Sequence, residues 1–281
     1  NLKAHFKTNY FGVHREVLAV DDISFDVERN EIFGLAGESS SGKTTLMKTI
    51  AGLIAPPLEL ISGQAQFAFM PHATNLYKAD PELLAKIRWR RLSYIMQGSM
   101  NVLNPLRKIK AIFNDFAAIH LPGSKYEFEE KVTAHLARLR LEPSVLDAYP
   151  HELSGGMRQR VTIALATICK PDFIIADEPT TALDVIVQKD VLGMIRSIQR
   201  EMGSSVLFVT HDMGVHASLT DRLGIIYAGC LVETGRTKDI FDKPLHPYTR
   251  HLIHSLPRIG DTIQRTSLTG TPPNLANPPS G

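Results

Sequence analysis

Short apolar runs alternate with helix-like segments along most of the chain. The apolar runs predict buried strands at residues 31–36, 92–96, 173–176, 206–210 and 222–227. Residues 18–27 alternate apolar and polar positions, which predicts a half-exposed strand. The helical pattern covers residues 42–53, 81–91, 154–170 and 185–202. Because strands of this kind, interleaved with helices, form a mainly parallel sheet with both faces covered, we expect an α/β core.

Two regions depart from this alternation. Residues 104–146 are mostly helical, interrupted at Pro122-Gly123, and predict a helical lobe inserted into the α/β core. After Gly235 proline becomes frequent, and residues 269–281 predict an extended or disordered tail. We find no internal repeat.

Composition narrows the classes of protein to which the chain can belong. A net charge of +2 is too small for a nucleic-acid-binding protein, so we expect no nucleic-acid partner. Cys169 and Cys230 lie in apolar stretches and predict buried free thiols in a reducing compartment. No run approaches the ~20 apolar residues that span a bilayer. Because the first residue is Asn1 rather than Met, we expect that the natural chain begins earlier.

A phosphate-binding loop follows the first buried strand. The sequence GESSSGKT at residues 37–44 fits G-x-x-x-x-G-K-[ST] between an apolar strand and a helix. Loop amides and the helix N-terminus can bind phosphate oxygens, Lys43 adds a positive charge, and the Thr44 hydroxyl can bind Mg²⁺. The predicted ATP-binding residues are Gly37, Glu38, Ser39, Ser40, Ser41, Gly42, Lys43, Thr44 and Thr45.

A second strand ends in two carboxylates. Residues 173–178 read FIIADE. Mg²⁺ prefers oxygen ligands and keeps several waters, so Asp177 is a candidate magnesium ligand, directly or through water. Glu178, one residue further on, points elsewhere and can polarise an attacking water.

Residues 153–160, LSGGMRQR, resemble the signature motif of the ATP-binding cassette (ABC) ATPases. Gln97 resembles the Q-loop glutamine, Ala182-Leu183-Asp184 the D-loop, and His211 the switch histidine, all in the family's order. The resemblance extends over residues 2–255. It implies a P-loop ABC-type α/β domain with N-terminal antiparallel strands and an inserted helical subdomain.

The signature motif also has a physical reading of its own. Ser154 and the following glycines open a helix, so their N–H groups and the hydroxyl form a second anion site. The resemblance implies that this surface faces the γ-phosphate held by another subunit, so a second cassette, identical or related, completes each site. The signature residues assigned to this role are Leu153, Ser154, Gly155, Gly156 and Gln159.

The resemblance also implies individual roles. Glu178, His211, Gln97 and Lys43 are the expected catalytic residues; Thr44, Gln97 and Asp177 are the expected Mg²⁺ ligands; and Asp184 is the D-loop carboxylate. Adenine stacks on an aromatic residue near the N-terminus, either Phe6 or Tyr10. The expected domains are residues 1–235, with the helical subdomain at about 98–169, and a C-terminal extension at 236–281.

Three stretches are similar to the dipeptide/oligopeptide permease ATPases. They are Leu103-Asn104-Pro105, Tyr149-Pro150-His151-Glu152, and LHPYTR at residues 245–250. The similarity implies an importer with two membrane permease subunits, served indirectly by an extracytoplasmic binding protein, and a place on the cytoplasmic face of the membrane. An oligosaccharide or nickel importer, a soluble ABC ATPase of DNA repair or translation, and a regulatory cassette remain the alternatives.

Several positions differ from the family pattern. Ser40 occupies a usual glycine position, where a β-carbon restricts positive φ and can alter nucleotide affinity. Thr44-Thr45 replaces the usual Ser-Thr and keeps the hydroxyl, whereas Gly98-Ser99 follows Gln97 in place of the frequent Asp-Pro. Nothing in this sequence supports an iron–sulfur cluster.

Overall fold

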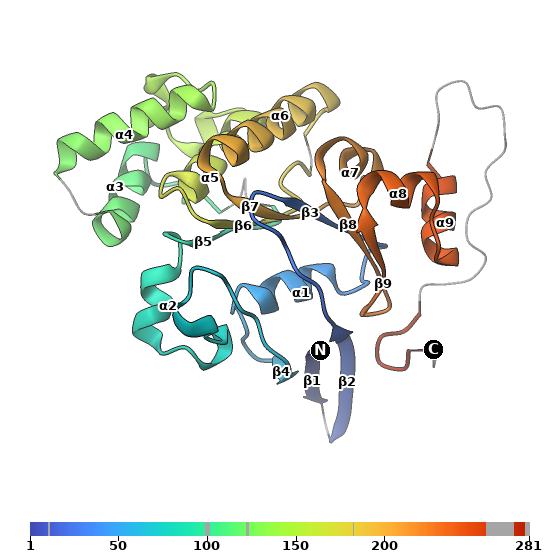
Figure 1. Ribbon diagram of the computed structural model, residues 1–281. Helices are drawn as coiled ribbons and strands as arrows, with labels where there is room; N and C mark the ends of the chain where they lie inside the picture. Colours follow the sequence, from blue (N-terminus) through green and yellow to red (C-terminus); the bar gives the residue numbers. More distant parts are fainter. Residues whose placement is uncertain (11, 99–101, 122–123, 182, 257–272, 279–281) are drawn as a thin grey trace. The chain divides into compact units, whose positions relative to one another are not determined.

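The computed structural model describes residues 1–10, 12–98, 102–121, 124–181, 183–256 and 273–278 (Figure 1). Pro122-Gly123, Ser99 and Ala182, and most of the predicted tail, lie outside these residues. The chain divides into two compact units. The first contains residues 1–79 and 207–281, and the second contains residues 80–206.

The first unit begins with an antiparallel sheet. Its strands are β1 (Leu2–Tyr10), β2 (Val13–Ile23) and β4 (Leu58–Ser62), in the order β2-β1-β4. Phe6 in the middle strand pairs with Val17 on one side and Leu58 on the other. The expected N-terminal antiparallel strands are therefore confirmed, although β2 begins before the predicted residue 18 and ends before residue 27. Residues 13–16 are exposed in a hairpin, so burial imposes no alternation on them.

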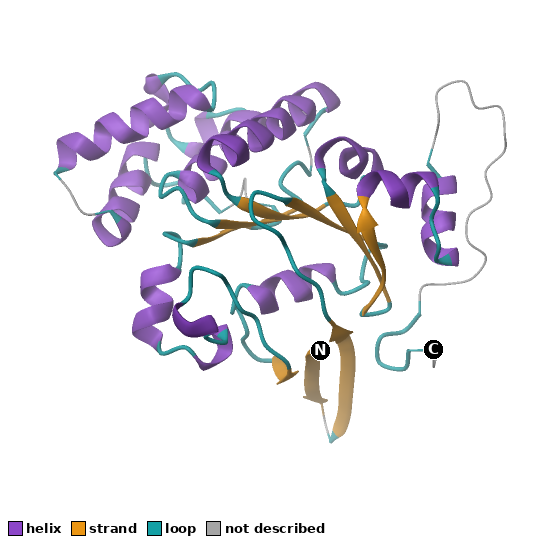
Figure 2. Cartoon of the chain, in the orientation of Figure 1, coloured by secondary structure: helices purple, strands orange, loops and turns teal. Residues whose placement is uncertain are grey.

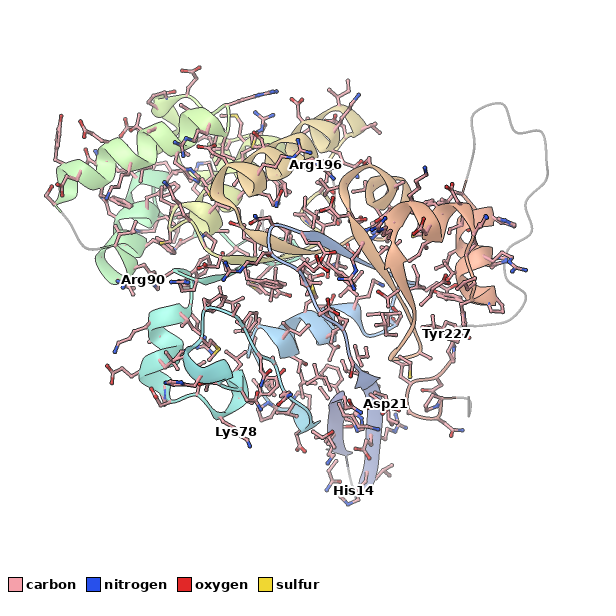
Figure 3. All side chains as sticks on the ribbon, in the orientation of Figure 1. His14, Asp21, Lys78, Arg90, Arg196 and Tyr227 are labelled. Atoms are coloured by element: carbon pink, nitrogen blue, oxygen red, sulfur yellow. The ribbon has the colours of Figure 1, made fainter. Side chains whose placement is uncertain are left out.

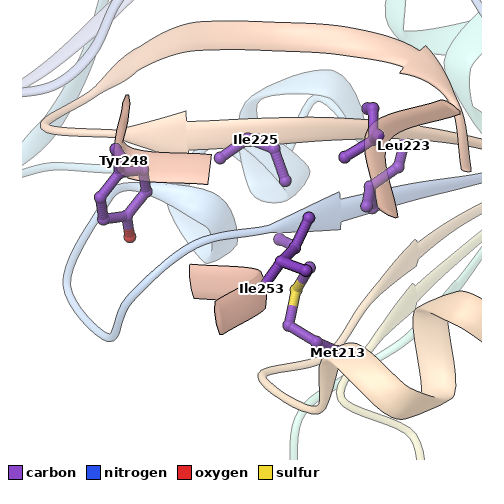
Figure 4. Packing of buried hydrophobic residues seen from close by; sticks show 7 residues of the cluster. Met213, Leu223, Ile225, Tyr248 and Ile253 are labelled. Atoms are coloured by element: carbon purple, nitrogen blue, oxygen red, sulfur yellow. The ribbon is translucent and has the colours of Figure 1, made fainter. Parts of the chain in front are cut away.

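The rest of the first unit is built around parallel strands β3 (Ile32–Ala36) and β8 (Arg222–Tyr227), with β9 (Cys230–Arg236) antiparallel to β8. The helices of this unit are α1 (Lys43–Ile50), α7 (Met213–Leu219), α8 (Thr237–Asp242) and α9 (Pro247–His254), with 3-10 turns at Pro71–Ala73 and Leu76–Lys78. A buried cluster joins β3, β8 and the C-terminal helices (Figure 4), and its members are Ala36, Met213, Leu223, Ile225, Ile240, Tyr248 and Ile253.

The second unit combines two parallel strands with helices (Figure 2). The strands are β5 (Leu92–Ile95) and β6 (Phe173–Asp177). The helices are α2 (Pro81–Ile87), α3 (Ile109–His120), α4 (Lys125–Arg138), α5 (Gly155–Thr167) and α6 (Val185–Met202), with 3-10 turns at Pro143–Asp147 and Pro150–Glu152. Strand β7 (Ser205–Val209) follows, where the chain passes back to the first unit.

Helix boundaries follow the local sequence closely. Helix α6 begins after Asp184, whose carboxylate accepts hydrogen bonds from the N–H groups of Ile186 and Val187. It ends at Gly203, which has a left-handed backbone (φ 67°). These are the predicted limits of the helix. With parallel pairs in both units, the predicted α/β fold class is confirmed.

The cysteine prediction was wrong for one residue. Both thiols are free, but Cys230 is exposed and Cys169 is only partly buried. Cys230 opens β9 directly after the turn at Ala228-Gly229, and β9 is partly exposed along its length. An apolar neighbourhood in the sequence therefore did not place this thiol in the core. Among the described residues, no helix is both long and apolar enough to cross a bilayer.

Candidate functional site

The phosphate loop joins β3 to α1 in the first unit. Gly42, immediately before the helix, has φ 103°, and a β-carbon there would lie 2.0 Å from the carbonyl oxygen of Ala19. Only glycine fits this position. Ser40 has φ 65°, so it adopts the left-handed backbone that its β-carbon disfavours.

Lys43 is the buried cation of this loop. Its Nζ donates to the carbonyl oxygens of Gly37 (2.8 Å) and Glu38 (2.6 Å) and lies 3.3 Å from Ser41 Oγ. A buried ammonium needs such acceptors. The loop therefore places a positive charge at the N-terminus of α1, where helix N–H groups already favour an anion. Thr44 and Thr45 lie half-buried in the first turn of α1.

A pocket of about 350 Å³ lies beside the loop, within the first unit. Loop residues 38–41 line it, together with Tyr227 and Ala228 at the end of β8 (Figure 3) and residues 273–275 near the C-terminus. The described part of the tail therefore lies close to the phosphate loop. Its attachment includes a hydrogen bond from the N–H of Leu18 to the carbonyl oxygen of Leu275 (2.9 Å).

In the second unit, Asp177 ends β6 as a nearly inaccessible carboxylate, 1% exposed. The Tyr94 hydroxyl donates to its Oδ2 (3.0 Å). Tyr94 pairs in register with Ile175, so it reaches diagonally to the residue two positions along the same face of β6. Burial, and then the charge of Asp177 and the hydrogen bond to it, raise the pKa of Tyr94, which therefore stays protonated and remains a donor.

Glu178 is held by two side chains. Its Oε2 accepts hydrogen bonds from Thr181 Oγ1 (2.8 Å) and Gln97 Nε2 (3.1 Å). Glu178 has φ 48°, a left-handed backbone that costs a non-glycine residue roughly 1–2 kcal/mol. The chain turns sharply after β6, so the adjacent carboxylates Asp177 and Glu178 engage different partners. The structure thus brings Gln97 and Glu178 into contact.

The signature segment opens α5, as predicted. Ser154 is its N-cap, with Oγ accepting from the N–H of Met157 (3.2 Å). A β-carbon on Gly156 would lie 2.7 Å from a methyl group of Val187, in the first turn of α6. The signature segment therefore packs against the first turn of α6, the helix that Asp184 caps. Leu153 and Gln159 are buried, whereas Ser154 and Asp184 are exposed.

The other predicted residues lie elsewhere in the first unit. His211 is exposed just after β7, and Asp212 beside it caps α7 through the N–H groups of Gly214 and Val215. Phe6 is half-buried in β1. The side chain of Tyr10 lies outside the described residues. No contact among the described residues decides between these two aromatic residues.

Sequence reasoning missed Tyr94, Thr181 and Tyr248. The Tyr248 hydroxyl accepts a hydrogen bond from the N–H of Glu38 in the phosphate loop (2.9 Å). Tyr94 could have been suspected from its place three residues before Gln97 on a buried strand. Nothing in the sequence indicated that Tyr248, in the segment His246-Pro247-Tyr248, bonds to Glu38 of the phosphate loop, 210 positions away.

Two family models match the chain. The ABC transporter model matches residues 20–181, and the model of the oligopeptide/dipeptide transporter C-terminal region matches residues 232–281. The first match includes the phosphate loop, Gln97, the signature segment and both carboxylates. The second includes Tyr248.

Curated relatives align over most or all of the chain. The dipeptide transport ATP-binding protein DppD of Bacillus subtilis (strain 168) is 39% identical over 285 residues, covering 100% of this chain and 83% of its own. DppD of Caldanaerobacter subterraneus is 38% identical over 268 residues, covering 94% and 81%. The oligopeptide transport ATP-binding protein OppD of B. subtilis is 36% identical, covering 100% and 78%.

A solved structure supports the fold. It is a dimeric ATP-binding cassette in a post-hydrolysis state bound to ADP and Pi, with a TM-score of 0.69 and 24% identity. The alignment covers 84% of this chain and 99% of that one. The two chains therefore share their fold.

Proposed function

This chain belongs to the ABC transporter family, and from that premise we propose that it is the ATP-hydrolysing subunit of an importer of dipeptides or oligopeptides. The observation that carries this proposal is the alignment over the full chain with peptide-transport ATP-binding proteins at 36–39% identity, including the C-terminal region. The names of these relatives favour peptides over the oligosaccharide and nickel alternatives.

The phosphate loop binds the triphosphate in this proposal. In the structure, Lys43 Nζ donates to two carbonyl oxygens of its own loop, which are neutral acceptors. Phosphate oxygens carry charge and make stronger hydrogen bonds with an ammonium, so Lys43 exchanges one set for the other when the nucleotide binds. The loop amides and Lys43 then stabilise charge on the γ-phosphate during transfer to water.

Glu178 orients the attacking water. Thr181 and Gln97 fix its Oε2, so the carboxylate keeps one orientation after the sharp turn that follows β6. A carboxylate held in this way accepts a hydrogen bond, and then a proton, from water. Because Gln97 contacts Glu178 directly, a displacement of the segment after β5 changes the orientation of the Glu178 carboxylate.

The donor set of this chain fits magnesium. Thr44, Asp177 and Gln97 supply hydroxyl, carboxylate and amide oxygens, which are the ligands that Mg²⁺ prefers. Asp177 is buried and hydrogen-bonded by Tyr94, so its free rotation is restricted. When held by these oxygens, Mg²⁺ would supply positive charge that neutralises charge developing on the phosphate.

A second cassette completes the site in this proposal. The N–H groups at the tip of α5, beside the exposed Ser154, bind the γ-phosphate held by the partner subunit. Asp184 caps α6, whose first turn packs against the signature segment. His211 contacts the γ-phosphate from its own subunit. In this proposal, closure of the two cassettes moves two permease subunits in the membrane. The chain therefore lies at the cytoplasmic face of the membrane.

The test is transport in reconstituted vesicles. The chain is co-purified from native membranes, its companions are identified by mass spectrometry, and the complex is placed in vesicles with its binding protein. We expect ATP-dependent uptake of a labelled dipeptide or oligopeptide. Uptake of a labelled oligosaccharide or of Ni²⁺ in its place would contradict peptide import. Failure to bind or hydrolyse ATP would contradict the ATPase assignment.

A further inference from the structure

One peptide group of the phosphate loop is held at both ends. The group joins Gly37 to Glu38: its carbonyl oxygen accepts from Lys43 Nζ (2.8 Å), and its N–H donates to the Tyr248 hydroxyl (2.9 Å). Lys43 comes from the loop's own helix. Tyr248 comes from the C-terminal region. One end of this peptide group is therefore held by a neighbour in the sequence and the other end by a residue 210 positions away.

Tyr248 is rigidly placed. Its ring belongs to the buried cluster that contains Ala36, the residue just before the loop (Figure 4). The ring centroid lies 4.5 Å from that of Tyr227, at an interplanar angle of 46°. The hydroxyl therefore cannot leave the loop without disturbing the packing of the core.

The start of α9 is also anchored. Glu233 on β9 accepts hydrogen bonds from the N–H groups of Leu245 (2.9 Å) and His246 (3.0 Å), and His246 Nδ1 accepts from the N–H of Tyr248 (3.2 Å). Burial alone would raise the pKa of Glu233, but the Leu245 amide, the Thr249 side chain, and the amide and charge of His246 together outweigh burial and lower it. An ionised carboxylate thus holds the segment that presents Tyr248.

The loop needs an external partner at this point. A β-carbon on Gly37 would lie 2.2 Å from the carbonyl oxygen of Ile226, so no side chain at residue 37 can restrict the backbone. When Lys43 turns to a phosphate, the Gly37 carbonyl loses its bond to that ammonium. The Glu38 N–H donates to Tyr248, so phosphate binding by Lys43 and the other loop amides leaves this bond in place.

We propose that Tyr248 is a positioning residue of the phosphate loop, holding the Gly37–Glu38 peptide group in its nucleotide-binding orientation through the tyrosine hydroxyl. The C-terminal region thereby sets nucleotide affinity. This proposal rests on the proposed function insofar as the loop binds ATP. Burial raises the pKa of Tyr248 to about 12, so the hydroxyl stays neutral at physiological pH.

The experiment compares Tyr248→Phe with a matched control, Tyr77→Phe. The Tyr77 hydroxyl donates to the carbonyl oxygen of Thr49 (3.0 Å) near the end of α1, so both variants lose one hydroxyl bonded to backbone. Tyr77 is half-buried. Loss of orientation reduces the fraction of loops ready to bind. We therefore expect the Kd and KM for ATP to rise roughly three- to tenfold in Tyr248→Phe.

The value of kcat at saturating ATP should stay within about twofold, because binding energy restores the orientation. Tyr77→Phe should leave Kd and KM unchanged. Equal effects of both variants, or a wild-type Kd in Tyr248→Phe, would overturn the proposal.

Hydrogen exchange gives a readout that does not depend on ATP. Without nucleotide, the Glu38 amide should exchange on the order of tenfold faster in Tyr248→Phe than in wild type or Tyr77→Phe. Unchanged exchange would also overturn the proposal. If the wild-type protein failed to bind ATP, the proposed function would fail, whereas the exchange comparison would still judge the role of Tyr248.

Discussion

The phosphate loop and the carboxylate pair are held in opposite ways. The hydrogen bonds from Lys43 to Gly37, Glu38 and Ser41 span two to six positions of sequence. These bonds of Lys43 stay within its own loop. The partners Tyr94 and Gln97, in contrast, lie 83 and 81 positions from Asp177 and Glu178. The carboxylates depend on the pairing of β5 with β6.

This difference predicts where substitutions act. We expect the phosphate loop to tolerate substitutions in other parts of the chain better than substitutions of its own glycines. A glycine has no β-carbon, and this absence leaves room for the neighbouring backbone. The positions of Asp177 and Glu178 should be sensitive to substitutions in or just after β5, a strand that contains neither carboxylate. Tyr248 and Gly229 are exceptions in the first unit, since they bond to Glu38 and Ser41 of the loop from far along the chain.

The largest effect should come from Glu178→Gln. The amide keeps the shape but cannot take a proton, so ATP hydrolysis should fall at least about a hundredfold while ATP is still bound. Phosphate release and nucleotide binding measure the two quantities. Glu82→Gln removes an exposed carboxylate on α2 and should leave both unchanged. Near-normal hydrolysis in Glu178→Gln would remove the assignment of the general base.

Acid should weaken the second unit through buried His135. Its Nε2 donates to Thr167 Oγ1 (2.8 Å), because that hydroxyl already donates to the carbonyl oxygen of Ile163. Burial, and then the charges of Arg138 and Lys170, lower the pKa of His135 from 6.5 to about 4.

Between these two values the unfolded chain binds the proton and the folded protein does not. This contribution to the free energy of unfolding is therefore complete above pH 6.5 and is lost as pH falls towards 4, by up to about 3 kcal/mol. Urea unfolding at several pH values measures it. His135→Gln should reduce the slope by roughly 1.4 kcal/mol per pH unit in that interval, and an unchanged slope would contradict the cause.

A smaller effect is expected from Tyr94→Phe. Asp177 would lose the donor that orients it, and outer partners of a metal ligand typically contribute about 10–100-fold in metal affinity or activity. We expect the Mg²⁺ concentration for half-maximal hydrolysis to rise about tenfold. The exposed Tyr126 on α4 supplies the control, Tyr126→Phe. An unchanged Mg²⁺ dependence would mean that strand pairing alone positions Asp177.

The smallest effect concerns Ser40. Its left-handed backbone costs roughly 1–2 kcal/mol, and glycine would relieve this but lose more chain entropy on folding. Ser40→Gly should therefore raise the free energy of unfolding by about 0.5 kcal/mol. Ser39 lies outside the left-handed region, so Ser39→Gly should lower stability instead. Thermal unfolding distinguishes the two signs.

Local sequence predicted many of the helices well. Asp184 and Gly203 limit α6, and Ser154 opens α5, because caps depend on the few residues around them. The hairpin of β1 and β2 was placed less well, since an exposed ribbon shows no burial pattern. The exposure of Cys230 was also missed, because it depends on the turn before β9.

The candidate site divides in the same way. The loop and the signature were recognised from short motifs whose residues act together because they are neighbours in the chain. Tyr94 and Tyr248 were not recognised, because each acts on a residue far away in the sequence. The chemical roles of the site residues, including His211 and Phe6 or Tyr10, stay predictions.

The sequence by itself determined the family, the phosphate loop, the two carboxylates and the helix ends, all of which rest on residues close together in the chain. Only the tertiary structure decided which side chains hold these groups in place. A hydroxyl selects its acceptor by distance and direction, and these follow from strand register and core packing. Tyr94 meets Asp177 through the register of β5 on β6, and Tyr248 meets Glu38 through the packing of α9.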